Sequence, residues 1–139
     1  MNKNYFIFLV SILISSCSQS IKKQDLSKLN GYWEIQKVVL DDGTKKDYSV
    51  NETIDFFEFK DNVGFRKKVT PQLDGTYLVN NQYEKISISE KENDFFINYS
   101  TQYTKFKEQI VEIQDSVLVL KNEQNVEYHY KKPIPFSVK

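Results

Sequence analysis

The chain has 139 residues, which is enough for one folded domain and too few for two. Its 19 Lys and Arg residues balance its 19 Asp and Glu residues, which argues against a polyanion or an anionic lipid surface as its main partner. Aromatic residues make up 14% of the chain, and a disordered chain would leave all that ring surface in water. The composition therefore indicates a single folded, aromatic-rich domain.

The first sixteen residues differ from the rest of the chain. Lys3 supplies a positive charge, residues 5–14 form an apolar run, and the small residues Ser15 and Ser16 follow it. The apolar run is ten residues long, whereas a membrane-spanning helix needs about 20. We therefore expect residues 1–16 to be a cleaved secretory signal peptide rather than a permanent membrane span or a buried core helix.

Cys17 is the single cysteine of the chain, and it lies directly after this segment. The stretch ISSC at 14–17 resembles the bacterial lipobox, in which an aliphatic residue and two small residues precede an invariant cysteine. The resemblance implies that the thiol carries a diacylglyceryl group and that Cys17 becomes the first residue of the mature protein. A lone thiol in an oxidising compartment has no disulfide partner in its own chain and could pair with another molecule. A thioether at Cys17 would also prevent this pairing. The alternative is an unmodified cysteine without a role.

Residues 17–28 are polar at first and show no apolar period, which predicts a lipidated tether between the membrane and the domain. No acidic run of the surface-export kind follows Cys17. We therefore expect a lipid-anchored protein of the bacterial cell envelope, in the outer membrane and facing the periplasm. Residues 25–30 (DLSKLN) carry the only helical signal, a turn or two that could plug one end of a barrel.

From residue 29 onward apolar residues recur with a period of two, which is typical of β-strands. In residues 94–100, for example, Phe95, Ile97 and Tyr99 share one face. Asn80 and Asn81 interrupt one such segment, and we count residues 76–89 as a single bent strand, which gives about eight strands. The segments with this pattern are 31–40, 52–60, 63–70, 76–80, 83–89, 94–100, 103–113, 116–121 and 125–131.

Short turns connect these segments. Gly43 and Gly75 each follow an aspartate, and Gly64 ends the polar stretch 61–64, so we expect all three glycines at hairpin turns. Sequential antiparallel strands with short turns favour an all-β, up-and-down barrel of about eight strands, because closure removes the unpaired edges. A two-sheet sandwich has the same strand spacing and is the alternative. Pro71 indicates an irregular end to the third strand.

The stretch LNGYWEIQ at 29–36 resembles the G-x-W motif that opens the first strand of lipocalins and of lipocalin-like domains in small bacterial lipoproteins. Residues 103–120 resemble the closing strands of those bacterial domains, so the resemblance covers a domain at 29–132. It implies that Trp33 packs across the closed end of the barrel and that Gly31 marks the entry into the first strand. Lipocalins often cover this tryptophan with an arginine, and here Lys131 or Lys132 would take that place.

The sequence offers little for catalysis, and we expect no enzyme, no metal and no cofactor. His129 is the only histidine and lies on the polar face of its predicted strand. Acidic residues near 41–42 and 90–94 do not have the spacing of a calcium loop and suit hairpin turns. We expect the basic clusters at 66–69 and 130–132 to be solvated strand faces or to be attracted to anionic head groups near the tether, and the zero net charge argues against nucleic acid.

The aromatic residues either fill the barrel or line a cavity. If the barrel is hollow, we expect a small apolar ligand. If it is filled, we expect a protein-interaction module, such as an envelope inhibitor or an assembly subunit, that acts through its loops or its extended tail at 133–139. The side chains expected to line a cavity are Tyr77, Tyr83, Phe95, Ile97 and Tyr99.

Overall fold

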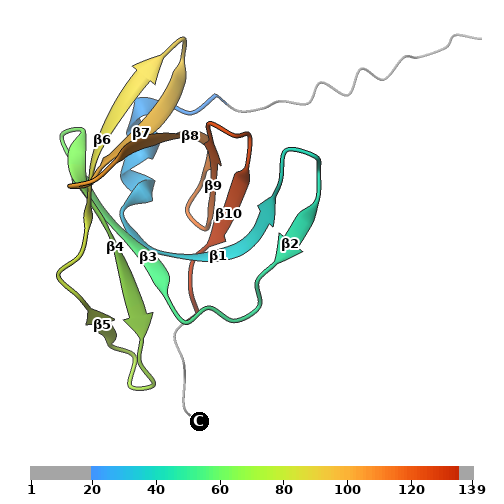
Figure 1. The fold of residues 1–139 in the computed structure, drawn as a ribbon. Helices are drawn as coiled ribbons and strands as arrows, with labels where there is room; N and C mark the ends of the chain where they lie inside the picture. Colours follow the sequence, from blue (N-terminus) through green and yellow to red (C-terminus); the bar gives the residue numbers. More distant parts are fainter. Residues whose placement is uncertain (1–19, 135–139) are drawn as a thin grey trace, which may run out of the picture.

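The computed structural model describes residues 20–134, so the predicted signal peptide, Cys17 and most of the tail lie outside the described residues. The described chain forms one short 3-10 helix and ten β-strands (Figure 1). They are η1 (Lys23–Leu29), β1 (Gly31–Val39), β2 (Lys45–Asp47), β3 (Ile54–Lys60), β4 (Val63–Pro71), β5 (Tyr77–Val79), β6 (Glu84–Lys91), β7 (Asp94–Ser100), β8 (Lys105–Ile113), β9 (Val117–Asn122) and β10 (Glu127–Lys131).

The strands close into an antiparallel barrel. Two of the ten strands are short additions, because β2 pairs only with β1 and β5 pairs only with β4. The other eight follow one another around a ring in the order β1, β3, β4, β6, β7, β8, β9, β10, and β10 pairs back onto β1. The prediction of an eight-stranded up-and-down barrel is confirmed, and the two-sheet alternative is wrong because no edge of the ring stays open.

Turn chemistry explains most of the connections. Gly43 and Gly75 have positive φ angles of 85° and 84°, as the hairpin turns after β1 and β4 require. Between β3 and β4, however, Asp61 and Asn62 form the turn, with φ of 53° and 65°. The expectation of a turn at Gly64 is wrong, since Gly64 lies inside β4.

Gly64 has a different role, which is to let two strands approach each other. It pairs with Phe59 across the β3–β4 ladder. A Cβ atom at this position would overlap the carbonyl oxygen of Glu58 and would lie 2.6 Å from the Cα of Phe59. The glycine is therefore required by packing of backbone against backbone.

The interruption expected at Asn80 and Asn81 is present. β5 and β6 pair with successive parts of the same edge of β4, β5 with residues 69–71 and β6 with residues 63–66. The chain leaves the ladder between them, at residues 80–83. The short strand β2, in contrast, has three exposed charged residues and no apolar alternation, so the sequence pattern did not predict it.

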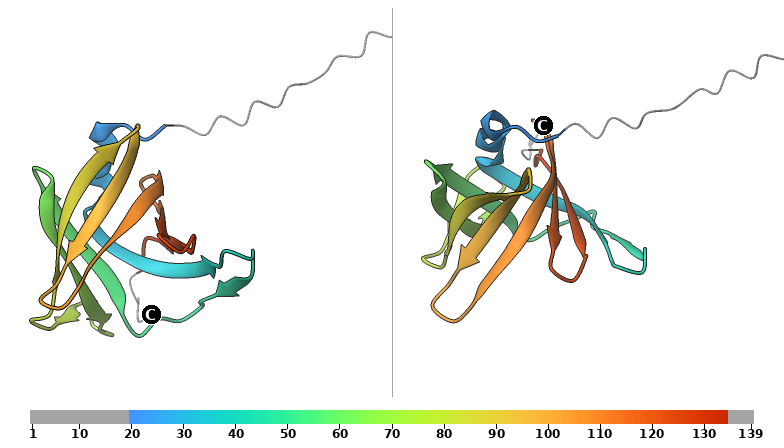
Figure 2. Two further views of the ribbon diagram at one scale, coloured as in Figure 1. Left: turned by 45° about the horizontal axis from the view of Figure 1, so that its top comes forward. Right: turned by 90° about the horizontal axis from the view of Figure 1, so that it is seen from above.

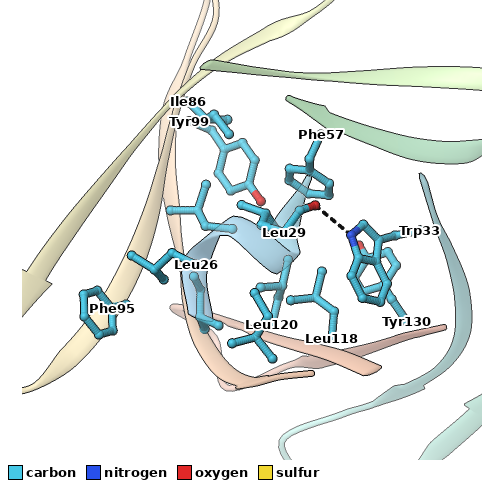
Figure 3. Close-up of a cluster of buried hydrophobic side chains, with 13 residues drawn as sticks. Leu26, Leu29, Trp33, Phe57, Ile86, Phe95, Tyr99, Leu118, Leu120 and Tyr130 are labelled. Carbon is cyan, nitrogen blue, oxygen red and sulfur yellow. Dashed lines mark hydrogen bonds between the residues drawn. The ribbon is translucent and has the colours of Figure 1, made fainter. Parts of the chain in front are cut away.

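One end of the barrel is solid. In Figure 2 the helix η1 lies across this end, and its Leu26 and Leu29 are buried among the inward-facing side chains of the strands. Figure 3 shows this cluster, with Leu26 and Leu29 in its middle and Trp33 at one side. Burying these side chains contributes about 1.5–3 kcal/mol each. The helix therefore plugs the barrel. The other residues of the core cluster include Phe57, Ile86, Phe95, Ile97, Tyr99, Ile110, Leu118, Leu120 and Tyr130.

Candidate ligand-binding site at the open end of the barrel

Trp33 and Gly31 both lie at the plugged end. The indole ring is fully buried, and its Nε1 donates a hydrogen bond to the carbonyl oxygen of Leu29 at 2.8 Å, which ties β1 to the end of η1 (Figure 3). The ammonium of Lys132 lies 3.9 Å from the centre of the Trp33 ring. Gly31 begins β1 with a φ of 115°. The indole and η1 therefore fill the interior at this end of the barrel.

The opposite end is hollow. Here the interior holds a cavity of about 440 Å³, formed where β8 and β10 begin and β9 ends. We call it the mouth cavity. Its walls include Ile35 and the rings of Phe106, Tyr128 and Tyr130. Its volume is in the range of small-molecule pockets, so the mouth cavity is large enough to accept a small ligand.

The floor of the mouth cavity carries a buried arginine. Arg66 points inward from β4, and only 12% of its side chain is exposed. Its Nε donates a hydrogen bond to a carboxylate oxygen of Glu84 at 2.5 Å, and its Nη1 lies 3.7 Å from Glu108. The guanidinium also lies over the ring of Tyr99, 4.3 Å from the ring centre. These contacts compensate for the cost of burying the charge.

Two buried carboxylates lie near Arg66 and Lys68, and one of them, Glu108, lines the mouth cavity. Burial raises the pKa of Glu108, although the hydroxyl of Tyr99 and the charge of Arg66 oppose this rise. Asp55 is buried on β3 and forms an ion pair with Lys68. One side-chain oxygen each of Asp55, Glu108 and Tyr99 is shielded from solvent without a hydrogen bond of good geometry. The mouth cavity thus combines aromatic walls with a polar, ionic floor.

None of the five side chains expected to line a cavity lies in the wall of the mouth cavity. Phe95, Ile97 and Tyr99 point into the barrel but are buried in the solid core. Tyr77 stacks on Tyr32, with ring centres 4.0 Å apart. Tyr83 lies in the connection after β5 and is half exposed. The barrel is therefore both filled and hollow, at opposite ends.

Sequence reasoning missed the residues that do line the mouth cavity. Tyr128 and Tyr130 could have been found, because they alternate with polar residues in the predicted strand at 125–131 and so share one of its faces. The inward positions of Arg66 and Glu108 were harder to find, because a charged residue in an alternating strand is normally assigned to the solvent face. Only the pairing of Arg66 with Phe57 and of Glu108 with Ile97 reveals that both point inward.

Other candidate sites contribute nothing to the mouth cavity. His129 lies on the outer face of β10, and its Nε2 is 3.1 Å from a carboxylate oxygen of Glu127. Among residues 20–134 no group of three or more potential ligands is placed to hold a metal ion. Within the same residues no helix has the length and the apolar character to cross a membrane.

Comparison with known proteins identifies the family. A family model described as a lipocalin-like domain matches residues 29–120, which is more than half of the chain. Two solved structures are similar: a lipocalin-like protein from Bacteroides uniformis (17% identity, TM-score 0.48) and an uncharacterized protein from Bacteroides eggerthii (14%, TM-score 0.47). Each alignment covers 76% of this chain and 99% of the other chain. No curated protein matches. The chain belongs to the lipocalin-like domain family.

Proposed function

We propose that this protein is a lipid-anchored lipoprotein of the bacterial cell envelope that binds a small, partly apolar molecule in its mouth cavity. The observation that carries the binding proposal is the hollow of about 440 Å³ at one end of a barrel whose other end is plugged. An eight-stranded barrel has room for one small ligand at most. The lipocalin-like fold supports the same role.

The lining of the mouth cavity suggests which ligand fits. An apolar or planar part of a ligand can pack against the rings of Phe106, Tyr128 and Tyr130. Its binding free energy gains about 25 cal/mol for each Å² of apolar surface that it buries there. A wholly apolar ligand would shield Arg66 and Glu108 from water without replacing its hydrogen bonds, which is costly. We therefore expect a ligand whose apolar body packs against the rings and whose polar end reaches the floor.

The proposed location in the cell depends on Cys17. Only five residues lie between Cys17 and the start of η1 at Lys23, and such a segment spans at most about 20 Å. Because η1 plugs the closed end, a lipid on Cys17 would keep that end near the bilayer and leave the mouth cavity accessible from the periplasm. Two or three acyl chains on one cysteine give lasting attachment, whereas a single chain binds only marginally.

Native mass spectrometry of the full-length protein from its own envelope, extracted in a mild detergent, tests the binding proposal. We expect a bound small molecule whose occupancy falls at least tenfold in Phe106→Ser, which removes a ring from the wall. Phe96→Ser is the matched control, because Phe96 points outward on β7 next to Lys107. If no preparation carries a bound molecule, or if both variants lose it equally, the proposal is wrong.

Metabolic labelling with a tagged fatty acid tests the anchor. The wild-type protein should incorporate the label and fractionate with membranes, and Cys17→Ser should do neither, since a serine hydroxyl forms no thioether. Ser16→Ala changes the neighbouring residue but keeps a small side chain, so it should be labelled normally. The proposed lipid anchor would be contradicted if Cys17→Ser loses its signal peptide and carries no label but still fractionates with membranes.

A further inference from the structure

A second hollow lies beside the mouth cavity, with a volume of about 570 Å³. It lies between the connection at residues 80–83 and the β7–β8 turn at residues 101–104, with Arg66 and Lys68 at its base. We call it the vestibule. Arg66 and Lys68 also line the mouth cavity, so the two hollows meet at these side chains. In the left view of Figure 2 the β7–β8 turn lies at the end away from η1.

Two exposed tyrosines face the vestibule, one from each loop. Tyr103 is 89% exposed and Tyr83 is 51% exposed. The ring of Tyr83 is held by an edge contact with Phe65, with ring centres 6.2 Å apart. The ring of Tyr103 has no aromatic contact within the part of the chain that the structure describes. The two rings therefore give the rim of the vestibule apolar surface that a bound molecule can cover.

Neutral amides supply the rest of the lining. Within residues 20–134 the side chains of Asn81, Gln82 and Gln102 form no hydrogen bonds, although each can donate two and accept through its oxygen. The loops around them are nevertheless ordered by other side chains. Asn80 accepts a hydrogen bond from the backbone of Gln82 at 3.0 Å, and Thr101 accepts one from the backbone of residue 104 at 3.0 Å. The unpaired amides therefore lie on connections whose backbone is held by hydrogen bonds.

The charged groups of the vestibule are already paired. Arg66 binds Glu84, and Lys68 forms its ion pair with Asp55. Bringing an anionic ligand to these cations would place it close to both carboxylates, and a cationic ligand would meet both cations. The remaining N–H groups of Arg66 and Lys68 can still donate hydrogen bonds to neutral groups, and the carboxylate of Glu84 can still accept them. The electrostatics of the vestibule therefore favour a ligand with many hydroxyls and no net charge.

We infer that the vestibule is a binding site for neutral saccharides. The hydroxyls of a sugar match the free amides together with Arg66 and Glu84, and its C–H face packs against a tyrosine ring, whose face is electron-rich. A purely apolar molecule would leave the amides without partners, which disfavours it here. The vestibule has room for a mono- or disaccharide. The vestibule shares Arg66 and Lys68 with the mouth cavity, but the inference does not depend on the ligand proposed for the mouth cavity.

Titration of the full-length protein with neutral mono- and disaccharides of glucose, galactose, mannose and N-acetylglucosamine tests this inference. A detergent without a sugar headgroup is needed, since a glucoside or maltoside would compete. Binding is followed by calorimetry and by saturation-transfer NMR. We expect at least one neutral sugar to bind in the millimolar range or tighter, and glucuronate, which is anionic, to bind more weakly than glucose.

Tyr103→Ala and Tyr83→Ala should each weaken saccharide binding about tenfold, which is the loss of one stacking contact. Tyr103 is so exposed that its removal leaves the fold intact. Tyr48→Ala, in the β2–β3 connection, is the matched control and should bind normally. Phe106→Ser, which perturbs the mouth cavity, should retain saccharide binding. The inference is overturned if no sugar binds, if glucuronate binds more tightly than glucose, or if both tyrosine variants bind like the wild type.

Discussion

Replacing Trp33 with phenylalanine isolates the hydrogen bond that joins the barrel to its plug. The indole Nε1 donates to the carbonyl oxygen of Leu29 at 2.8 Å, and both residues are fully buried. A phenylalanine ring leaves this carbonyl without a partner, which costs about 1–3 kcal/mol, and the smaller ring also leaves a cavity. We expect Trp33→Phe to lower the free energy of unfolding by about 2–4 kcal/mol.

Urea unfolding measures this loss, followed by far-UV circular dichroism because the variant lacks the only tryptophan of the chain. Lys132→Met, alone and combined with Trp33→Ala, measures the contact of the ammonium with the indole ring. Lys132 lies 3.9 Å from the ring centre, and such a contact contributes about 0.5–1 kcal/mol at a partly exposed site. The double-mutant cycle should therefore show a coupling of that size.

Two results would refute this reasoning. If Trp33→Phe unfolds within 0.5 kcal/mol of the wild type, the buried Leu29 carbonyl has found water or another donor, and the hydrogen bond does not hold the plug. If Lys132→Met has the same effect in the presence and absence of Trp33, the ammonium and the indole do not interact. An unchanged m value is required for either comparison, since a change in m would mean a different denatured state.

Three further predictions concern the strands, the floor and the plug. Gly64→Ala should destabilise the protein by about 3 kcal/mol or more, because its Cβ would overlap the Glu58 carbonyl, whereas Gly75→Ala, with open space around it, should cost about 1 kcal/mol; equal midpoints in urea would contradict the close approach. Glu108→Gln should gain stability over the wild type as pH rises above the ordinary carboxyl pKa of 4.5. Burial raises the pKa of Glu108 in the folded state, so ionisation of Glu108 destabilises the fold. This destabilisation disappears as pH falls below 4.5, and a stability difference between variant and wild type that does not change with pH would contradict the raised pKa. Leu29→Ala should cost about 2–5 kcal/mol in thermal or urea unfolding, and a loss below 1 kcal/mol would show that η1 is not part of the core.

Local patterns were sufficient for most of the barrel. Alternation of apolar and polar residues predicts strands such as β7 because a half-buried strand has a side-chain period of two. Gly43 and Gly75 follow aspartates and do occupy turns, since a positive φ is a property of a few adjacent residues. Gly64 also comes shortly after an aspartate and an asparagine, but its absent side chain serves a close approach to Glu58 on another strand, which no local pattern records. The expectation at this position therefore failed.

The amino-acid sequence by itself indicated most of the strands and their antiparallel succession, because both depend on local periodicity and short connections. Closure of the barrel was decided by the tertiary structure, since it depends on the pairing of β10 with β1, at opposite ends of the domain. Which side of the barrel wall an aromatic residue occupies was decided only by the tertiary structure. Tyr99 and Tyr77 look alike in the sequence, yet one is in the core and the other stacks on Tyr32. The inward charges of Arg66 and Glu108 also belong to the tertiary structure, since burial of a charge is tolerated only where strands distant in sequence bring its partners together.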